Sequence, residues 1–110
     1  MYDRDIKIIE DYIDEYLYMP KSYWPDWEYD IQAYSRCAGE EILERVIVEA
    51  LKLPPHITGI EPKETTEIIE EYISDMDYFY EISRDTHKKL IFFMARDVGI
   101  EILNLFKRRS

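Results

Sequence analysis

The sequence predicts an all-α fold, a four-helix bundle built from two tandem αα-hairpins that are related by an internal duplication. Apolar residues recur at steps of three and four in four segments, as on one face of an α-helix. No segment combines sustained period-two alternation with a hairpin turn, so no strand is expected. The hexapeptide IIEDYI at 8–13 returns as IIEEYI at 68–73. A chain of 110 residues is the length of a single domain, 1–110.

A proline-containing loop separates the first two expected helices. The first covers residues 3–18 and ends before Pro20, which cannot continue a helix. The second begins near Pro25 and continues to about Leu53, ahead of Pro54. The apolar positions of the first are Ile6, Ile9, Ile13, Tyr16 and Leu17. The expected inward face of the second is Ile31, Ser35, Ala38, Gly39, Ile42, Leu43, Val46 and Ala50.

A second pair of helices is expected after the connector that contains HITGIEP. Pro62 opens the third helix. Ser83 or Asp85 can cap the fourth helix, which continues to about Arg108. The apolar positions of the third helix include Ile69, Tyr72, Ile73, Met76 and Phe79.

The two halves of the chain match when one is shifted by 60 positions. Of the 44 aligned pairs between residues 3–46 and 63–106, 12 are identical, where chance would give roughly three or four at this composition. Repeat 1 would span about 3–55 and repeat 2 about 61–109. Each hairpin would bury its apolar face against the other. Gly39 and Gly99 occupy equivalent positions, which predicts a close crossing of the two long helices.

The charge of the chain restricts its partners. The net charge is −10, which repels nucleic acid and anionic membranes and favours a basic protein partner. Solubility is the alternative reason for such a surface. No run of 18 apolar residues is present, and the charged start does not read as a signal peptide. Cys37 is the single cysteine, so no internal disulfide can form and a cytoplasmic location is expected.

The fourth expected helix differs from its counterpart in having more apolar residues. Gln32, Ala33, Glu40 and Arg45 of the second helix are replaced by Phe92, Phe93, Ile100 and Leu105. Its apolar arc is wider than one bundle contact requires. We therefore expect a second apolar surface that forms a homodimer, unless loops cover it. The residues of this expected surface are Phe92, Phe93, Ile100 and Leu103.

The loop between the first two helices is rich in aromatic residues. Such side chains act as lids on bundle ends or as anchors at interfaces. Asp26, Glu28 and Asp30 lie nearby and would suit a basic protein surface. The candidate partner-binding residues are Tyr23, Trp24, Trp27 and Tyr29.

The sequence offers little for nucleophilic or metal catalysis, and no cofactor is expected. Cys37 lies near the expected inward face, which favours a buried structural cysteine. His56 and His87 belong to no E-x-x-H pair, and no Gly-rich phosphate loop is present.

Acidic residues on the second and third helices give the enzyme alternative. EEILE at 40–44 resembles the E-E-x-x-E motif of all-α nucleoside-triphosphate pyrophosphohydrolases of the MazG type, which is followed in that family by E-x-x-D. Glu71 and Asp75 are one residue too far apart to match that second motif. The resemblance implies a Mg²⁺ site made of Glu40, Glu41, Glu44, Glu71 and Asp75.

Together these features predict a small, acidic, non-enzymatic protein-binding or adaptor module. One alternative is an acidic inhibitor from a phage or mobile element that mimics nucleic acid. The other is the Mg²⁺-dependent nucleotide hydrolase.

Overall fold

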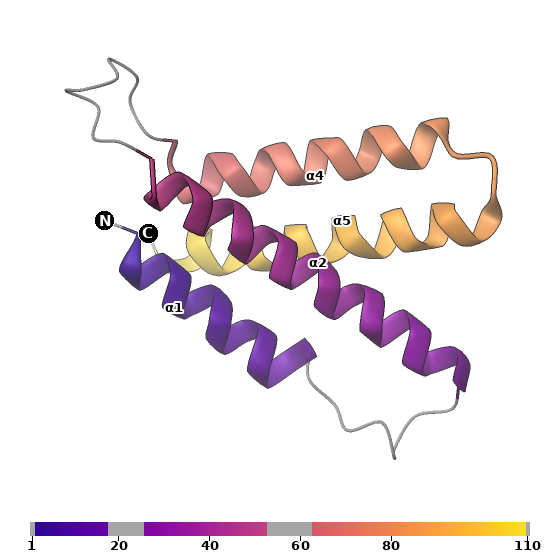
Figure 1. Ribbon diagram of the computed structural model, residues 1–110, viewed down its shortest axis with the longest axis horizontal. Coiled ribbons are helices and arrows are strands. Elements are labelled where there is room, and N and C mark those ends of the chain that lie inside the picture. Colours follow the sequence, from indigo (N-terminus) through magenta and orange to yellow (C-terminus); the bar gives the residue numbers. More distant parts are fainter. Residues whose placement is uncertain (1, 18–25, 53–62, 110) are drawn as a thin grey trace.

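A computed structural model describes residues 2–17, 26–52 and 63–109, and within these ranges it describes the side chains of all but 26–32 and 109. Every described element is helical, which confirms the all-α prediction. Helix α1 (Asp3–Tyr12) continues directly into a π-helix, η1 (Ile13–Leu17). Helix α2 is Asp26–Ala50, α4 is Thr65–Ile82 and α5 is Thr86–Arg109 (Figure 1).

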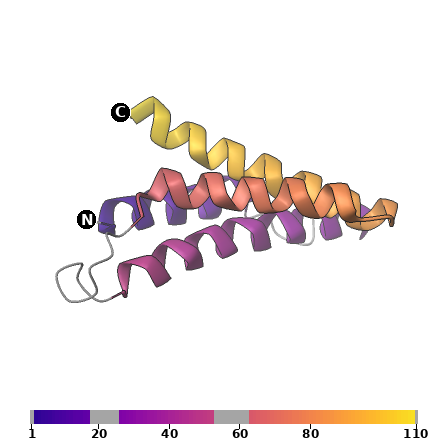
Figure 2. The same cartoon turned by 90° about the horizontal axis from the view of Figure 1, so that it is seen from above.

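The helices form an elongated bundle that measures 50 × 32 × 24 Å. The two termini lie at one end, and the turn between α4 and α5 lies at the other (Figure 1). Helices α4 and α5 pack together along most of their length, and α2 packs chiefly against α5. Seen from above, α5 and α2 lie on opposite sides of α4, and they diverge toward the end that holds the termini (Figure 2).

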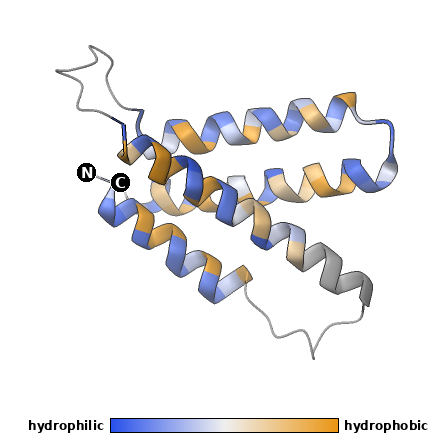
Figure 3. Ribbon diagram, viewed as in Figure 1, coloured by the Kyte–Doolittle hydropathy of each residue, from blue (hydrophilic) through white to orange (hydrophobic). Residues whose placement is uncertain are grey.

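The core lies in the part of the bundle where all four helices meet. Its fully buried side chains come from every helix, and the isoleucines among them occupy positions that are 60 residues apart: Ile9 and Ile69, Ile42 and Ile102. Apolar residues line the inner sides of the helices (Figure 3). Burying a side chain of this size stabilises the fold by about 1.5–3 kcal/mol relative to leaving it exposed.

The π-helix at Ile13–Leu17 changes the expected face of the first helix. A π-helix bonds residue i to i+5 and so takes more residues per turn than an α-helix. Ile13 and Leu17 therefore both stay buried, whereas Tyr16 is turned outward and is 65% exposed. The prediction that Tyr16 belongs to the apolar face is wrong, because it assumed uninterrupted α-helical geometry.

The two glycines make close approaches within their own hairpins. A Cβ on Gly39 would lie 2.8 Å from Leu17 and 3.0 Å from Ile13. A Cβ on Gly99 would lie 2.8 Å from Ile73 and 3.4 Å from Tyr72. Close crossings were expected, but between the two long helices. They occur instead between the long and the short helix of each hairpin.

Two polar interactions between the hairpins involve residues that lie 60 positions apart in the sequence. The Tyr12 hydroxyl donates to Glu101 Oε2 at 3.2 Å. Tyr72 lies 60 positions after Tyr12, and Glu41 lies 60 positions before Glu101. Burial raises the pKa of the Tyr72 hydroxyl, and the negative charge of Glu41 raises it further. Burial, reinforced by these carboxylates, raises the pKa of Tyr12 to about 12 and also raises the pKa of Tyr72.

The helix ends agree with the sequence in part. Asp85 caps α5, because its Oδ1 accepts a hydrogen bond from the His87 backbone N–H at 3.0 Å. Helix α2 ends at Ala50, three residues before Leu53, and Ala50 is exposed rather than inward. Pro20 and Pro62 lie outside the described residues, while α4 begins at Thr65.

Candidate functional site

The end of the α4–α5 hairpin carries a group of large apolar side chains that the bundle leaves uncovered. Tyr78 is 61% exposed, Ile82 is 55% and Leu90 is 44%. Large apolar side chains that gather in an exposed region can mark an interaction site. We call this group the hairpin-end surface, and it consists of Tyr78, Phe79, Tyr80, Ile82, Leu90, Phe92 and Phe93.

Ring contacts join the two helices at two places in the hairpin-end surface, one on each side of the line where α4 meets α5. The Phe79 and Phe92 rings lie 5.4 Å apart, and the Tyr80 and Phe93 rings lie 6.3 Å apart. Tyr78 meets Phe79 edge-on at 5.8 Å. These separations fall in the range of favourable aromatic pairs. The rings therefore hold one another in place before any partner arrives.

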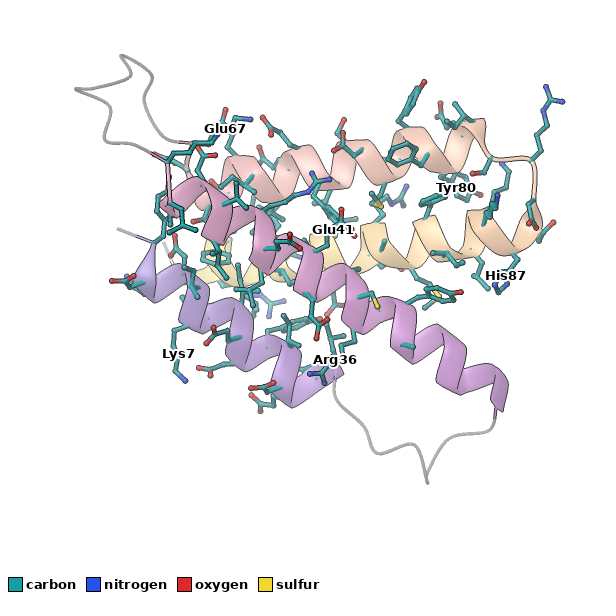
Figure 4. The ribbon with its side chains drawn as sticks, viewed as in Figure 1. Lys7, Arg36, Glu41, Glu67, Tyr80 and His87 are labelled. Atoms are coloured by element: carbon teal, nitrogen blue, oxygen red, sulfur yellow. The ribbon has the colours of Figure 1, made fainter. Side chains whose placement is uncertain are left out.

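Two cations lie over the rings on one side of this surface. Lys89 Nζ is 4.6 Å from the Tyr80 ring, and the Arg96 guanidinium is 5.3 Å from the Phe93 ring. Arg96 also binds Asp77 of α4 at 2.7 Å, and this bond is the first cause of its raised pKa. Figure 4 places Tyr80 on the side of α4 that faces α5. These contacts fix the two helices to each other beside the rings.

The exposure of this surface follows from the path of α2. Near the middle of α4, Arg45 of α2 binds Asp75 at 3.0 Å. Tyr78, Phe79 and Ile82 follow at helical spacing and continue the side of α4 that α2 contacts. By then α2 has crossed toward α5, where Tyr34 lies 6.2 Å from His87 (Figure 1). Among the described helices, none therefore covers the α2-facing side of α4 at the hairpin end.

The four residues predicted for the homodimer surface differ in how far the structure buries them. Phe93 is 42% exposed and belongs to the hairpin-end surface. Phe92 is half-buried, packed against the core on one side and Phe79 on the other. Ile100 is half-buried. Leu103 lies in the core of the single chain, so its place on an outer surface is wrong. The helix is rotated so that Leu103 follows Gly99 and Ile102 inward.

The predicted partner-binding aromatic side chains all fall outside the part of the chain that the structure describes. Tyr23 and Trp24 lie outside the described residues. Trp27 and Tyr29 are on α2, but their side chains are also outside them. Tyr78, Tyr80, Ile82 and Leu90 were not predicted as site residues. The signal that could have found them is the aromatic run YFY at 78–80, which one bundle contact cannot bury.

The acidic residues of the enzyme alternative come together partly, in a groove of about 330 Å³ between α2 and α4. Glu41, Glu44 and Glu71 line it, but so do Arg45 and Lys63. The remaining two carboxylates, Glu40 and Asp75, do not line it. Most of the five are paired with cations of the chain: Arg36–Glu40 at 3.0 Å, Arg45–Glu41 at 3.4 Å, Arg45–Asp75 at 3.0 Å and Lys63–Glu71 at 2.9 Å.

One more carboxylate lines this groove. Glu49 is buried and binds Lys52 Nζ at 2.7 Å and the Lys63 backbone N–H at 2.9 Å. These bonds, first to Lys52 and then to Lys63, lower the pKa of Glu49. The bond from the Lys63 backbone N–H to Glu49 joins the end of α2 to the start of α4, and Arg45–Asp75 joins the two helices further along. The other pairs lie within one segment, so most of these carboxylates have structural partners in the chain itself.

Other chemical groups in the described part of the chain are scattered. No set of three or more His, Cys, Asp or Glu side chains there is arranged to hold a metal ion. Cys37 is exposed rather than buried, because Ala38 and Gly39 take the inward positions of α2. His87 is exposed at the start of α5, and His56 lies outside the described residues (Figure 4).

None of the helices in the described ranges is both long enough and apolar enough to span a membrane.

No protein-family model, no curated protein and no solved structure matches this chain. The geometry of the molecule is therefore the basis for a functional proposal.

Proposed function

We propose that this chain is a non-enzymatic protein-binding module and that the hairpin-end surface is its docking site. The observation that carries this proposal is the concentration of exposed aromatic side chains at that end of the bundle, paired across α4 and α5. Aromatic side chains supply much of the binding energy of protein interfaces. Rings that already pack against one another lose little conformational entropy on binding, which favours affinity.

The charge of the hairpin end, unlike that of the whole chain, does not favour a basic partner. A basic partner was expected from the net charge of −10. Residues 76–93, which include the hairpin-end surface, hold three acidic and three basic side chains and are therefore neutral. An apolar docking surface in a neutral setting favours a partner with apolar anchors over one selected by positive charge alone. The nucleic-acid-mimic alternative depends on overall acidity, to which this end contributes nothing.

We also propose that the two hairpins descend from one duplicated unit. The equivalent glycines each approach the equivalent isoleucine, Ile13 or Ile73. Asp5 and Thr65, which are equivalent positions, are hydrogen-bonded to each other, as expected near a twofold axis. On this account the shared residues maintain the bundle, and the residues that differ, such as Phe92 and Phe93, carry the function.

A photo-reactive side chain placed on the surface tests the docking site. Benzoylphenylalanine would replace Tyr78 in the full chain, and the matched control would carry it at Tyr16, which is similarly exposed at 65% but lies on η1. We expect discrete cross-linked proteins from position 78 and not from position 16. Identical patterns from both positions, or none from either, would contradict the proposal.

The enzyme alternative has its own test. Hydrolysis of nucleoside triphosphates with Mg²⁺ or Mn²⁺ would be measured for the wild type and for Glu41→Gln. The proposal expects no turnover by either protein, because Arg45 binds the Glu41 carboxylate. Turnover that is lost in Glu41→Gln would replace the binding module with a metal-dependent hydrolase.

A further inference from the structure

We infer that the side of the α4–α5 hairpin that is turned away from α2 binds a second copy of this chain in a symmetric homodimer. The inference rests on the proposed protein-binding function, because Tyr80 and Phe93 belong to the hairpin-end surface. It assigns these two rings to self-association and leaves the α2-facing side, with Phe79, to another partner. We call the dimerising side the outer face, and it consists of Ile73, Asp77, Tyr80, Phe93, Arg96 and Ile100.

Contacts between the two helices fix two rows of the outer face. The Tyr80 and Phe93 rings lie 6.3 Å apart. About one helical turn along, Arg96 binds Asp77 at 2.7 Å. The Arg96 guanidinium also lies 5.3 Å from the Phe93 ring. The ring pair and the ion pair are therefore neighbours on one side of the hairpin.

Helical spacing adds a third row, which is made of isoleucines. Ile73 lies seven residues before Tyr80, and Ile100 lies seven residues after Phe93. Seven residues make about two helical turns, so each isoleucine shares a side of its helix with a ring. Ile73 lies close to Gly99, the neighbour of Ile100. The ion pair is therefore flanked by a row of rings and a row of isoleucines.

Helix α2 lies against the opposite side of α4. Arg45 of α2 binds Asp75 at 3.0 Å, whereas Asp77, which lies about 200° further around the helix, binds α5. Figure 2 likewise shows α2 and α5 on opposite sides of α4. The outer face is left open to solvent, since Tyr80 is 37% exposed and Phe93 is 42% exposed.

Packing within the bundle does not require Phe93 and Ile100. The residues 60 positions earlier are Ala33 and Glu40, and Glu40 is exposed. The first hairpin therefore folds with a small residue and a charged residue at these positions. Large apolar side chains that replace them and stay partly exposed favour a contact outside the chain.

The charge pattern of the outer face is complementary to itself. A twofold axis that runs along the line between α4 and α5 stacks α4 of each copy on α5 of the other. Asp77 of each copy then faces Arg96 of the other, so the four charges alternate in sign, and each apolar row meets its own copy. An axis across the helices would instead bring Asp77 against Asp77. The ion pair therefore selects the first arrangement.

The net charge of this end also permits self-association. Residues 73–100, which hold the outer face, contain five acidic and four basic side chains, so they contribute −1 to the net charge of −10. Residues 3–17 contain six acidic and two basic side chains and contribute −4. Because like charges across an interface disfavour association, two copies repel each other less at the outer face than at α1.

The contact is small, so the dimer should be weak. At their exposed fractions the two rings together offer roughly 160 Å², if each would expose about 200 Å² in an extended chain. A standard interface buries about 800 Å² on each partner. The rings therefore form only the centre of the contact, and we expect a dissociation constant on the order of tens of micromolar.

A charge-swap variant tests this arrangement without removing an ion pair from the chain. Asp77→Arg/Arg96→Asp exchanges the two charges, so the pair within each copy remains and the variant should dimerise with itself. In a mixed dimer of wild type and variant, each carboxylate faces a carboxylate and each guanidinium faces a guanidinium. The mixed dimer should therefore be about tenfold weaker than either homodimer.

Light scattering would follow the wild type toward twice the chain mass of 13.4 kDa. Native mass spectrometry of isotopically labelled wild type with unlabelled variant would measure the mixed dimer, which should fall from a statistical share of about one half to about one tenth of all dimers. The matched control is Lys7→Asp/Asp11→Lys, which swaps an exposed ion pair on α1. It should mix with the wild type in the statistical proportion.

Ile100→Glu is an independent test, because it gives α5 the residue type that α2 carries at Glu40. It should raise the dissociation constant by about tenfold or more, while circular dichroism shows an unchanged helix content. The inference would be overturned by a wild type that is monomeric up to about 1 mM, by statistical mixing of the charge-swap variant, or by unchanged dimerisation of Ile100→Glu.

Failure of the dimer remains distinguishable from failure of the proposed function. A monomeric chain whose position 78 still cross-links to other proteins would overturn only the dimer. A monomeric chain that cross-links to nothing would overturn both proposals.

Discussion

The two hairpins use equivalent residues for packing and different residues at their surfaces. In the first, α1 gives way to a π-helix at Ile13–Leu17. In the second, the equivalent stretch, 73–77, remains within the regular helix α4, which continues to Ile82. Helix α4 is therefore longer than α1, and its last turns follow the point at which α2 has left α4 for α5.

The residues that pack the core of the bundle therefore differ from the residues that remain exposed and free to contact a partner. Ile9, Ile42, Ile69 and Ile102 are fully buried and would be needed whatever the protein binds. Phe92 and Phe93 stand where the first half has Gln32 and Ala33. The fold requires the isoleucines, and it leaves much of the aromatic hairpin end in contact with solvent.

The largest effects should come from the shared core. Ile42→Ala and Ile102→Ala each remove a fully buried side chain at equivalent positions. Each should lower the free energy of unfolding by about 2–5 kcal/mol, through lost burial and the cavity that remains. Urea denaturation would measure both. A loss of less than about 1 kcal/mol for one of them would mean that the two positions do not share a role.

The next effect distinguishes the buried tyrosines at alkaline pH. Burial, followed by the charge of Glu101, raises the pKa of Tyr12 from 10.0 to about 12. The unfolded chain therefore ionises first, and stability that is complete below about pH 10 falls as the pH rises toward 12. A shift of this size corresponds to about 2–3 kcal/mol.

Tyr12→Phe should make this alkaline loss smaller, and Tyr72→Phe should do the same, because burial also raises the pKa of Tyr72. Urea denaturation at several values between about pH 9 and pH 12 would measure it. The environments are not identical, because Arg45 lies 4.9 Å from the Tyr72 ring, whereas the residue 60 positions after Arg45 is the uncharged Leu105. An unchanged alkaline profile in both variants would show that neither hydroxyl is linked to folding.

The smallest effects compare the two glycines. Alanine improves helix propensity by about 1 kcal/mol at either position. At Gly39 the new Cβ meets the Leu17 Cδ1 atom at 2.8 Å, at the end of a flexible side chain, and Cγ1 of the β-branched Ile13 less closely, at 3.0 Å, so the net change in stability should be within about 0.5 kcal/mol. At Gly99 it meets Cγ1 of Ile73 at 2.8 Å, and a β-branched side chain cannot easily move away.

Gly99→Ala should therefore destabilise the protein by about 1 kcal/mol more than Gly39→Ala. Thermal unfolding of the two variants side by side would measure the difference. Equal melting temperatures would mean that both contacts relax equally well.

The sequence was sufficient to predict the helices but not their rotation. Apolar spacing identified four helical segments, and Asp85 was predicted as a cap. The inward turn of Leu103, the outward turn of Tyr16 and the exposure of Cys37 depend on small rotations and on the π-helix. Those are set by packing between helices rather than by local pattern.

The candidate site was predicted in part for a similar reason. Phe93 was predicted because it replaces the smaller Ala33 of the first half, and the structure leaves it exposed. Tyr78 and Ile82 were missed because their exposure depends on where α2 leaves α4, which no local segment encodes. The acidic residues read as a possible metal site are instead largely paired with Arg36, Arg45 and Lys63.

The most direct test of the contrast between the hairpins is amide hydrogen exchange of the wild-type chain, alone and bound to a protein that position 78 cross-links. Docking at the hairpin end predicts that protection at residues 76–93 rises in the complex, while protection at residues 3–17 stays constant. Protection that is unchanged at both segments, or that rises at residues 3–17 instead, would contradict the assignment of the hairpin end as the binding surface.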